Sequence, residues 1–155
     1  MIAGILAIGF LSLVFSALFA FDVLRRPQGN ETMMRIAKAV QEGARAFLNR
    51  QYKTVSLFTV IIGAVLYGTL GVTTALSFIA GAFLSALAGY IGMMVSIKAN
   101  VRTAQAAATG LQAALNVSFR GGAVNGLAVV GLGILGVTAL YSIYGNPNLI
   151  VGFAF

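Results

Sequence analysis

The sequence has 155 residues, of which 59% are hydrophobic and 8% are charged, whereas a soluble domain has about 45–50% apolar residues. It contains no Cys and no His, which excludes disulfides and metal sites built from thiolate or imidazole groups. The net charge of +7 comes from Lys and Arg residues that interrupt long apolar runs. Membrane topology explains this pattern better than nucleic-acid binding, so no nucleic-acid partner is expected.

Four apolar segments are long enough to cross a hydrocarbon core of about 30 Å. The predicted transmembrane helices cover about 2–24, 54–70, 75–97 and 121–144. A cleaved signal peptide is the alternative interpretation of the first segment. A signal peptide, however, has its positive charges before the apolar run, and here they come after it. The uncharged stretch from 54 to 97 must turn back, and GTLGVTT at 68–74 is the best place. The tail 149–155 resembles the start of a further, truncated span.

Two basic segments separate these spans. Residues 25–53 hold seven Lys and Arg residues and residues 98–120 hold the other three. The positive-inside rule therefore predicts a multi-pass cell-membrane protein with both basic segments cytoplasmic and its N-terminus outside. The fold class is an all-α integral membrane protein with four transmembrane helices, cytoplasmic helical extensions and a place in a larger multi-helix bundle.

The first basic segment has the periodicity of an amphipathic helix that continues without a break into the second span. Asn30 is its predicted N-cap. Ion pairs are expected between neighbouring turns of this helix, from Glu31 to Arg35 and from Glu42 to Lys38 and Arg45. The segment could lie on anionic headgroups. The unbroken join to a span instead favours a protruding helix that packs on other protein.

The two basic segments resemble each other. A displacement by 67 residues aligns 35–53 with 102–120, and seven of the nineteen positions are identical. The identical pairs are Arg35/Arg102, Ala37/Ala104, Ala39/Ala106, Gly43/Gly110, Ala46/Ala113, Leu48/Leu115 and Asn49/Asn116, and Tyr52/Phe119 and Lys53/Arg120 are conservative. Chance is the alternative in so Ala-rich a chain. The pattern predicts two helical hairpins related by an axis along the membrane normal.

Small residues recur in the last two spans. They fall at every fourth position at Ser77, Gly81, Ser85 and Gly89, and again at Gly122 and Gly126. Such faces favour close helix packing, with a glycine-lined channel as the less favoured alternative. Asn125 is expected to bond to a neighbouring helix. No charged residue lies mid-span, so the four helices contain no proton relay or ion path.

The only acidic residues, Asp22, Glu31 and Glu42, are well separated. A Mg²⁺ site needs a cluster of carboxylates. The sequence therefore predicts no catalytic, cofactor-binding or metal-binding residue in this chain.

Three strings carry a family resemblance: EGARAFLNRQYKT at 42–54, GYIGMMVSIKANVRTAQAA at 89–107 and LNVSFRGGAVNGLAVVGLGILG at 115–136. They are similar to the N-terminal region of membrane-bound, ion-pumping pyrophosphatases. The resemblance implies a homodimer that couples hydrolysis of Mg²⁺-pyrophosphate to export of protons or sodium ions. It also implies that the Mg²⁺ ligands lie outside this chain, in an Asp-rich motif just beyond its last residue. The four helices would belong to an outer layer around a catalytic ring.

Two hypotheses from different classes follow. The first is an N-terminal, outer-layer portion of such a pump, truncated in this sequence and inactive alone. Its partners would be the lipid bilayer, the remaining helices of the pump, a second copy and pyrophosphate. The alternative is a stand-alone four-helix membrane scaffold or accessory subunit that catalyses nothing. A basic protein that only binds anionic lipid surfaces is a third possibility, and it predicts release from the membrane by salt.

Overall fold

A computed structural model describes residues 2–155, except the side chains of 148 and 149. Every element in this part of the chain is helical, which confirms the all-α fold. The elements are α1 (Ile2–Arg25), α2 (Glu31–Leu70), α3 (Val72–Ala107), α4 (Leu111–Tyr144) and the 3₁₀ helix η1 (Pro147–Ala154). The four α-helices are all long and apolar enough to cross a membrane, so the chain is a multi-pass membrane protein.

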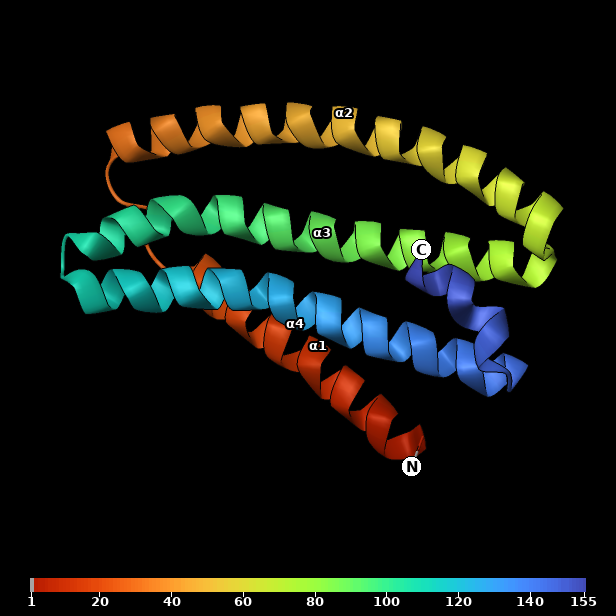
Figure 1. Ribbon diagram of the computed structural model, residues 1–155. Helices are drawn as coiled ribbons and strands as arrows, with labels where there is room; N and C mark the ends of the chain where they lie inside the picture. Colours follow the sequence, from red (N-terminus) through yellow and green to blue (C-terminus); the bar gives the residue numbers. More distant parts are fainter. Residues whose placement is uncertain (1) are drawn as a thin grey trace.

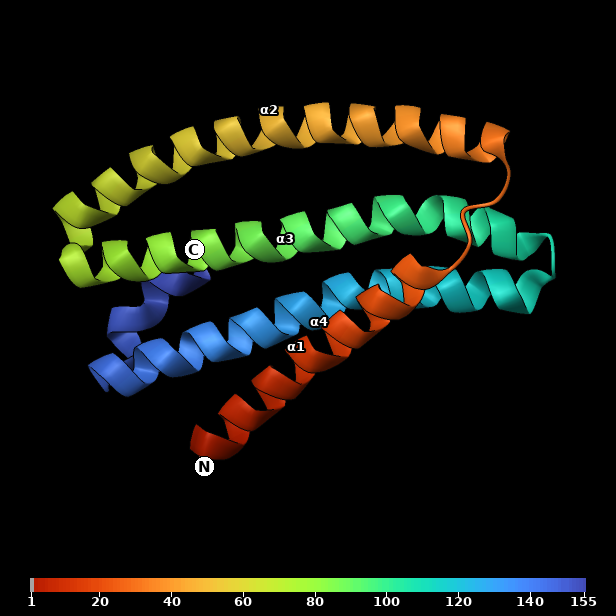
Figure 2. The same cartoon turned by 180° about the vertical axis from the view of Figure 1, so that it is seen from behind.

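The helices form an open bundle whose core lies between α1, α3 and α4. In Figures 1 and 2, α2, α3 and α4 run roughly alongside one another in alternating directions, and α1 crosses α4 obliquely. α4 packs against α3 and α1, whereas α2 packs against α3 alone of the α-helices. The repeat predicts two helical hairpins related by an axis along the membrane normal, and this relation stays a prediction. Within this chain α2 and α3 pack as one hairpin about Gly71, and α3 and α4 pack as the next.

α2 is one continuous helix of 40 residues, as its periodicity indicates. Asn30 is its N-cap, since the side-chain Oδ1 accepts a hydrogen bond from the Met33 amide at 2.9 Å. Gly71 ends the helix with a φ of 87° and starts α3, which confirms the predicted turn. The expected ion pairs along α2 do not form, because both ion pairs of the described residues involve Asp22.

The second basic segment is not a single helical extension. α3 ends at Ala107 and α4 begins at Leu111. Between them the chain turns at Gly110, whose φ of 141° is strained for residues with a Cβ. The segment thus consists of two helix ends joined by a tight turn.

Small residues make the core contacts, but not all at the predicted positions. Ser77 and Gly81 are buried as expected, whereas a Cβ added at Gly122 or Gly126 would meet nothing within 4 Å. That Gly122 and Gly126 pack on a further helix stays a prediction, since the face of α4 that is packed in this chain is one residue away, where Gly121 lies against Ala99. One residue turns a helix face by about 100°.

Two further contacts complete the fold. The Asn125 side chain lies against Gly92 of α3, so it does reach a neighbouring helix, and Gly92 leaves the room for it. η1 folds back along α3, with Gly152 against Thr74 and the Phe153 ring against Gly136. That 149–155 begins a further span stays a prediction.

Candidate functional site

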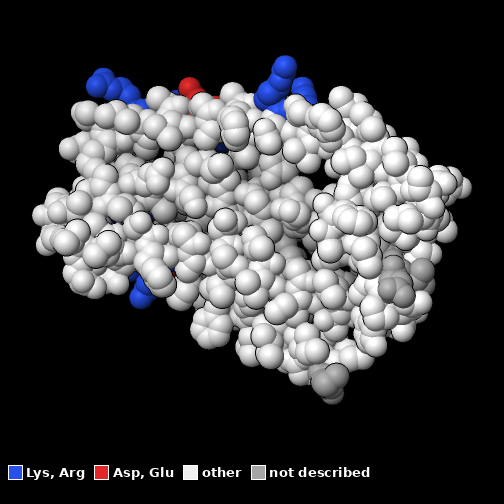
Figure 3. All heavy atoms as spheres, in the orientation of Figure 1, with Lys and Arg blue, Asp and Glu red and all other residues white. Residues whose placement is uncertain are grey.

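Charged side chains gather at one end of the bundle, where α1 and α3 end and α2 and α4 begin (Figures 1 and 2). Figure 3, a side view, shows Lys and Arg at the upper edge of the left half and centre and at the lower left edge, and none over the right-hand third. The basic residues thus lie in one half of the bundle, from the end where α2 and α4 begin to the middle of α2.

At this charged end lies a cluster in which one carboxylate joins two helices. Oδ2 of Asp22, on α1, accepts hydrogen bonds from Nε and Nη2 of Arg26 at 3.3 and 3.0 Å. The same oxygen accepts one from Nη1 of Arg120, on α4, at 2.8 Å. Because each of these side chains is about a third exposed, the cluster is open to ligands as well as binding α1 to α4.

Arg102 lies beside this cluster but is 6% exposed. Its guanidinium donates to the carbonyls of Leu24 at 2.9 Å, Arg26 at 3.1 Å and Lys98 at 2.6 Å. The Leu24 carbonyl is one of the last of α1, and the Arg26 carbonyl directly follows the helix. Carbonyls at this end of a helix have no partner within it and carry the negative end of the helix dipole. Burial lowers the pKa of Arg102, but a guanidinium remains charged in proteins. Arg102 is thus the C-terminal cap of α1.

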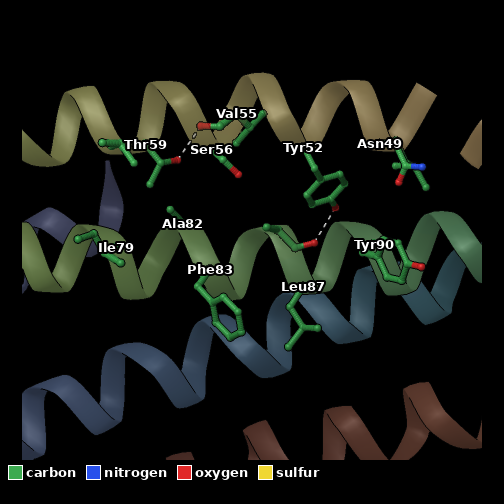
Figure 4. A pocket seen from close by; sticks show the side chains of 13 residues that line it. Asn49, Tyr52, Val55, Ser56, Thr59, Ile79, Ala82, Phe83, Leu87 and Tyr90 are labelled. Atoms are coloured by element: carbon green, nitrogen blue, oxygen red, sulfur yellow. Dashed lines mark hydrogen bonds between the residues drawn. The ribbon is translucent and has the colours of Figure 1, made fainter. Parts of the chain in front are cut away.

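A groove of about 590 Å³ separates α2 from α3. Figure 4 shows Tyr52 reaching across it from α2, where its hydroxyl donates to the Ala86 carbonyl at 2.7 Å. The Tyr52 and Tyr90 rings meet edge to face with centroids 6.1 Å apart. The remaining lining is mostly apolar, such as Val55 and Phe83, so the groove suits hydrocarbon.

The charged end does not fit a catalytic Mg²⁺. In residues 2–155, no three acidic residues come together in a way that could hold a metal ion. Asp22 already binds two guanidiniums, while Glu31 and Glu42 are exposed on α2. Mg²⁺ needs carboxylate oxygens that are free to coordinate it. That this chain holds no catalytic or metal-binding residue stays a prediction, and no reaction step can be assigned to its side chains.

Sequence reasoning missed the Asp22 cluster and the cap made by Arg102. The spacing of Asp22 and Arg26 is a readable signal, because residues four apart on a helix are neighbours. Nothing local links either residue to Arg120 or Arg102, which come from α4 and α3.

These features define a class of protein: a polytopic helical membrane protein with one strongly basic end. Comparison with known proteins then identifies the family. Residues 10–155 match the family model described as inorganic H⁺ pyrophosphatase. The chain therefore belongs to this family, as the sequence resemblance indicated.

Individual relatives agree. The chain is 50% identical over 149 residues to a K⁺-insensitive pyrophosphate-energized proton pump of Methanosarcina mazei, a match that covers 95% of this chain and 22% of the relative. It is 47% identical to a second such pump, from Moorella thermoacetica, with 95% and 23% covered. A putative K⁺-stimulated pyrophosphate-energized sodium pump of Clostridium tetani is 43% identical, with 94% and 22% covered. The chain thus spans about a fifth of the length of the curated relatives it matches.

Proposed function

We propose that this chain is the N-terminal, outer-layer portion of a pump that couples hydrolysis of Mg²⁺-pyrophosphate to export of protons or sodium ions. The observation that carries the proposal is the 50% identity to a pyrophosphate-energized proton pump over 95% of this chain. Relatives that pump protons and relatives that pump sodium match it at similar identity. The proposal therefore covers both ions.

The exposed surface of α2 supports a role within a larger bundle. Large apolar side chains such as Leu57, Val60 and Val65 are 59–69% exposed. Within this chain α2 packs only against α3 among the α-helices. In the pump we expect further helices of the same subunit, or of a second copy, to cover part of this surface. The chain would then act as a scaffold for the catalytic part.

A chimera tests this function. The aligned segment of the Methanosarcina mazei pump is replaced by this chain, and inverted vesicles are assayed for Mg²⁺-dependent pyrophosphate hydrolysis and proton uptake. We expect both activities to be retained, whereas the segment-deleted pump and this chain alone should show neither. A chimera that reaches the membrane in normal amounts and neither hydrolyses nor pumps would contradict the proposal.

The proposed orientation places the basic end in the cytoplasm and the Gly71 turn outside. The chain has no native cysteine, so labelling of a single introduced cysteine shows which side of the membrane that position faces. Thr69 and Thr109 are a matched pair, because both are exposed and each hydroxyl bonds to a backbone carbonyl of its own turn. In intact cells, an impermeant thiol reagent should label Thr69→Cys and spare Thr109→Cys. The opposite pattern would refute the orientation.

A further inference from the structure

An apolar stripe on α1 leads directly to the charged cluster. Leu11, Phe15 and Leu18 precede Asp22 at spacings of three and four residues, so they share one face of the helix. Their exposed fractions are 52%, 50% and 54%. The face that α1 turns toward α4 is a different one, where Ser16 is 5% exposed. The stripe is therefore open along its length and ends at the basic end of the bundle.

The cluster at the end of the stripe has a surplus of positive charge. Asp22 is a single carboxylate between Arg26 and Arg120, and Arg25 stacks on the Phe21 ring with its guanidinium carbon 3.7 Å from the centroid. Two guanidiniums thus share one carboxylate, and Arg25, the residue before Arg26, adds a third positive charge that forms no ion pair in the described residues. Each guanidinium has five N–H donors. The bonds to Asp22 use two donors of Arg26 and one of Arg120. Donors remain for an anion with several oxygens, which guanidiniums bind bidentately.

The depth of the cluster corresponds to that of lipid phosphates. α1 has 24 residues and so is about 36 Å long, slightly more than the hydrocarbon core of about 30 Å. Arg25 and Arg26 lie at its end, where headgroups begin. A free phosphate would use the guanidiniums alone, whereas a phospholipid also uses the stripe.

We propose that this face of the protein is a binding site for one anionic phospholipid. Arg26 and Arg120, with Arg25 beside them, bind the headgroup phosphate, and an acyl chain lies along Leu11, Phe15 and Leu18. The site depends on no catalytic activity and exists in the 155-residue chain itself. It is formed by the ends of α1 and α4, so a bound lipid also bridges these two helices.

The test is thermal unfolding of the full chain in neutral detergent micelles. It compares added phosphatidylglycerol, phosphatidylcholine with the same acyl chains, and inorganic phosphate. A ligand that binds only the folded state raises the melting temperature. We expect phosphatidylglycerol to raise it by several degrees and the other two to leave it unchanged. An equal rise with phosphatidylcholine or with inorganic phosphate alone would overturn the proposal.

Matched variants locate the effect. Arg26→Gln/Arg120→Gln should lose at least half of the rise with phosphatidylglycerol, whereas Arg35→Gln/Arg45→Gln removes the same charge from exposed positions of α2 and should keep it. Equal losses in both would mean non-specific attraction and overturn the site. Arg25→Gln separates loss of lipid binding from loss of stability, because Arg25 forms no ion pair in the described residues and its removal breaks none. This variant should lower the rise in part, and an unchanged rise would contradict the proposal.

Discussion

The two basic segments of similar sequence, 35–53 and 102–120, have different structures at matched positions. Gly43 lies inside the continuous helix α2, and a Cβ there would meet nothing within 4 Å. Its counterpart Gly110 has a φ of 141° and separates α3 from α4. Arg35 is exposed, whereas Arg102 is buried and caps another helix. The comparison teaches that the shared pattern suits a straight helix and a hairpin end equally, and that contacts distant in sequence select between them.

The largest expected effect comes from removing the buried arginine of the second segment. Arg102→Leu should lower the free energy of unfolding by about 2–4 kcal/mol, because charged hydrogen bonds contribute about 1.5–3 kcal/mol and the two part-buried carbonyls at the end of α1 lose this donor. The matched change Arg35→Leu should stay within about 0.5 kcal/mol at its exposed position. Equilibrium unfolding in mixed micelles measures both. Equal effects would mean that Arg102 is not the cap of α1.

The matched glycines should respond with opposite signs. Gly110→Ala should destabilise the chain by about 1–3 kcal/mol, because a Cβ is strained at this φ. Gly43→Ala should stabilise it by about 0.5–1 kcal/mol, since Ala replaces Gly inside an open helix face. The same unfolding measurement gives both values. Destabilisation by Gly43→Ala would show that α2 is not a regular helix at this point.

The aromatic pair of the repeat should show the smallest difference. Tyr52→Phe removes the hydroxyl that bonds to Ala86 and should cost about 0.5–1.5 kcal/mol. The reverse exchange, Phe119→Tyr, adds a hydroxyl to a ring that is 75% exposed and should be neutral within about 0.5 kcal/mol. A neutral Tyr52→Phe would mean that this bond does not hold α2 against α3.

Local patterns predicted most of the fold. The unbroken helix from Glu31, its cap at Asn30 and the turn at Gly71 follow from periodicity and from residue types that begin and end helices. The packed face of α4 could not be predicted in the same way. The sequence does not distinguish among the glycines of α4, such as Gly121, Gly122 and Gly126. The position of α3 determines that Gly121 is the one in contact.

The candidate site was less predictable than the fold. The spacing of Asp22 and Arg26 indicates a bond along one helix, but Arg120 joins them from 98 residues away in the sequence. Arg102 resembles Arg35 in the aligned repeat, and its burial depends on the end of α1 lying beside it. Such partners are set by tertiary packing, for which a single sequence has no local signal.

The hydroxyls of α1 have a consequence for the order of assembly during synthesis. Ser12 donates to the Leu127 carbonyl and Ser16 to the Val124 carbonyl, both at 2.8 Å and both more than 100 residues later in the chain. At about 5–20 residues per second, α4 emerges roughly 5–20 s after α1. Until then both hydroxyls can bond only to carbonyls of their own helix. The two hydrogen bonds that join α1 to α4 can therefore form only after α4 has been synthesised.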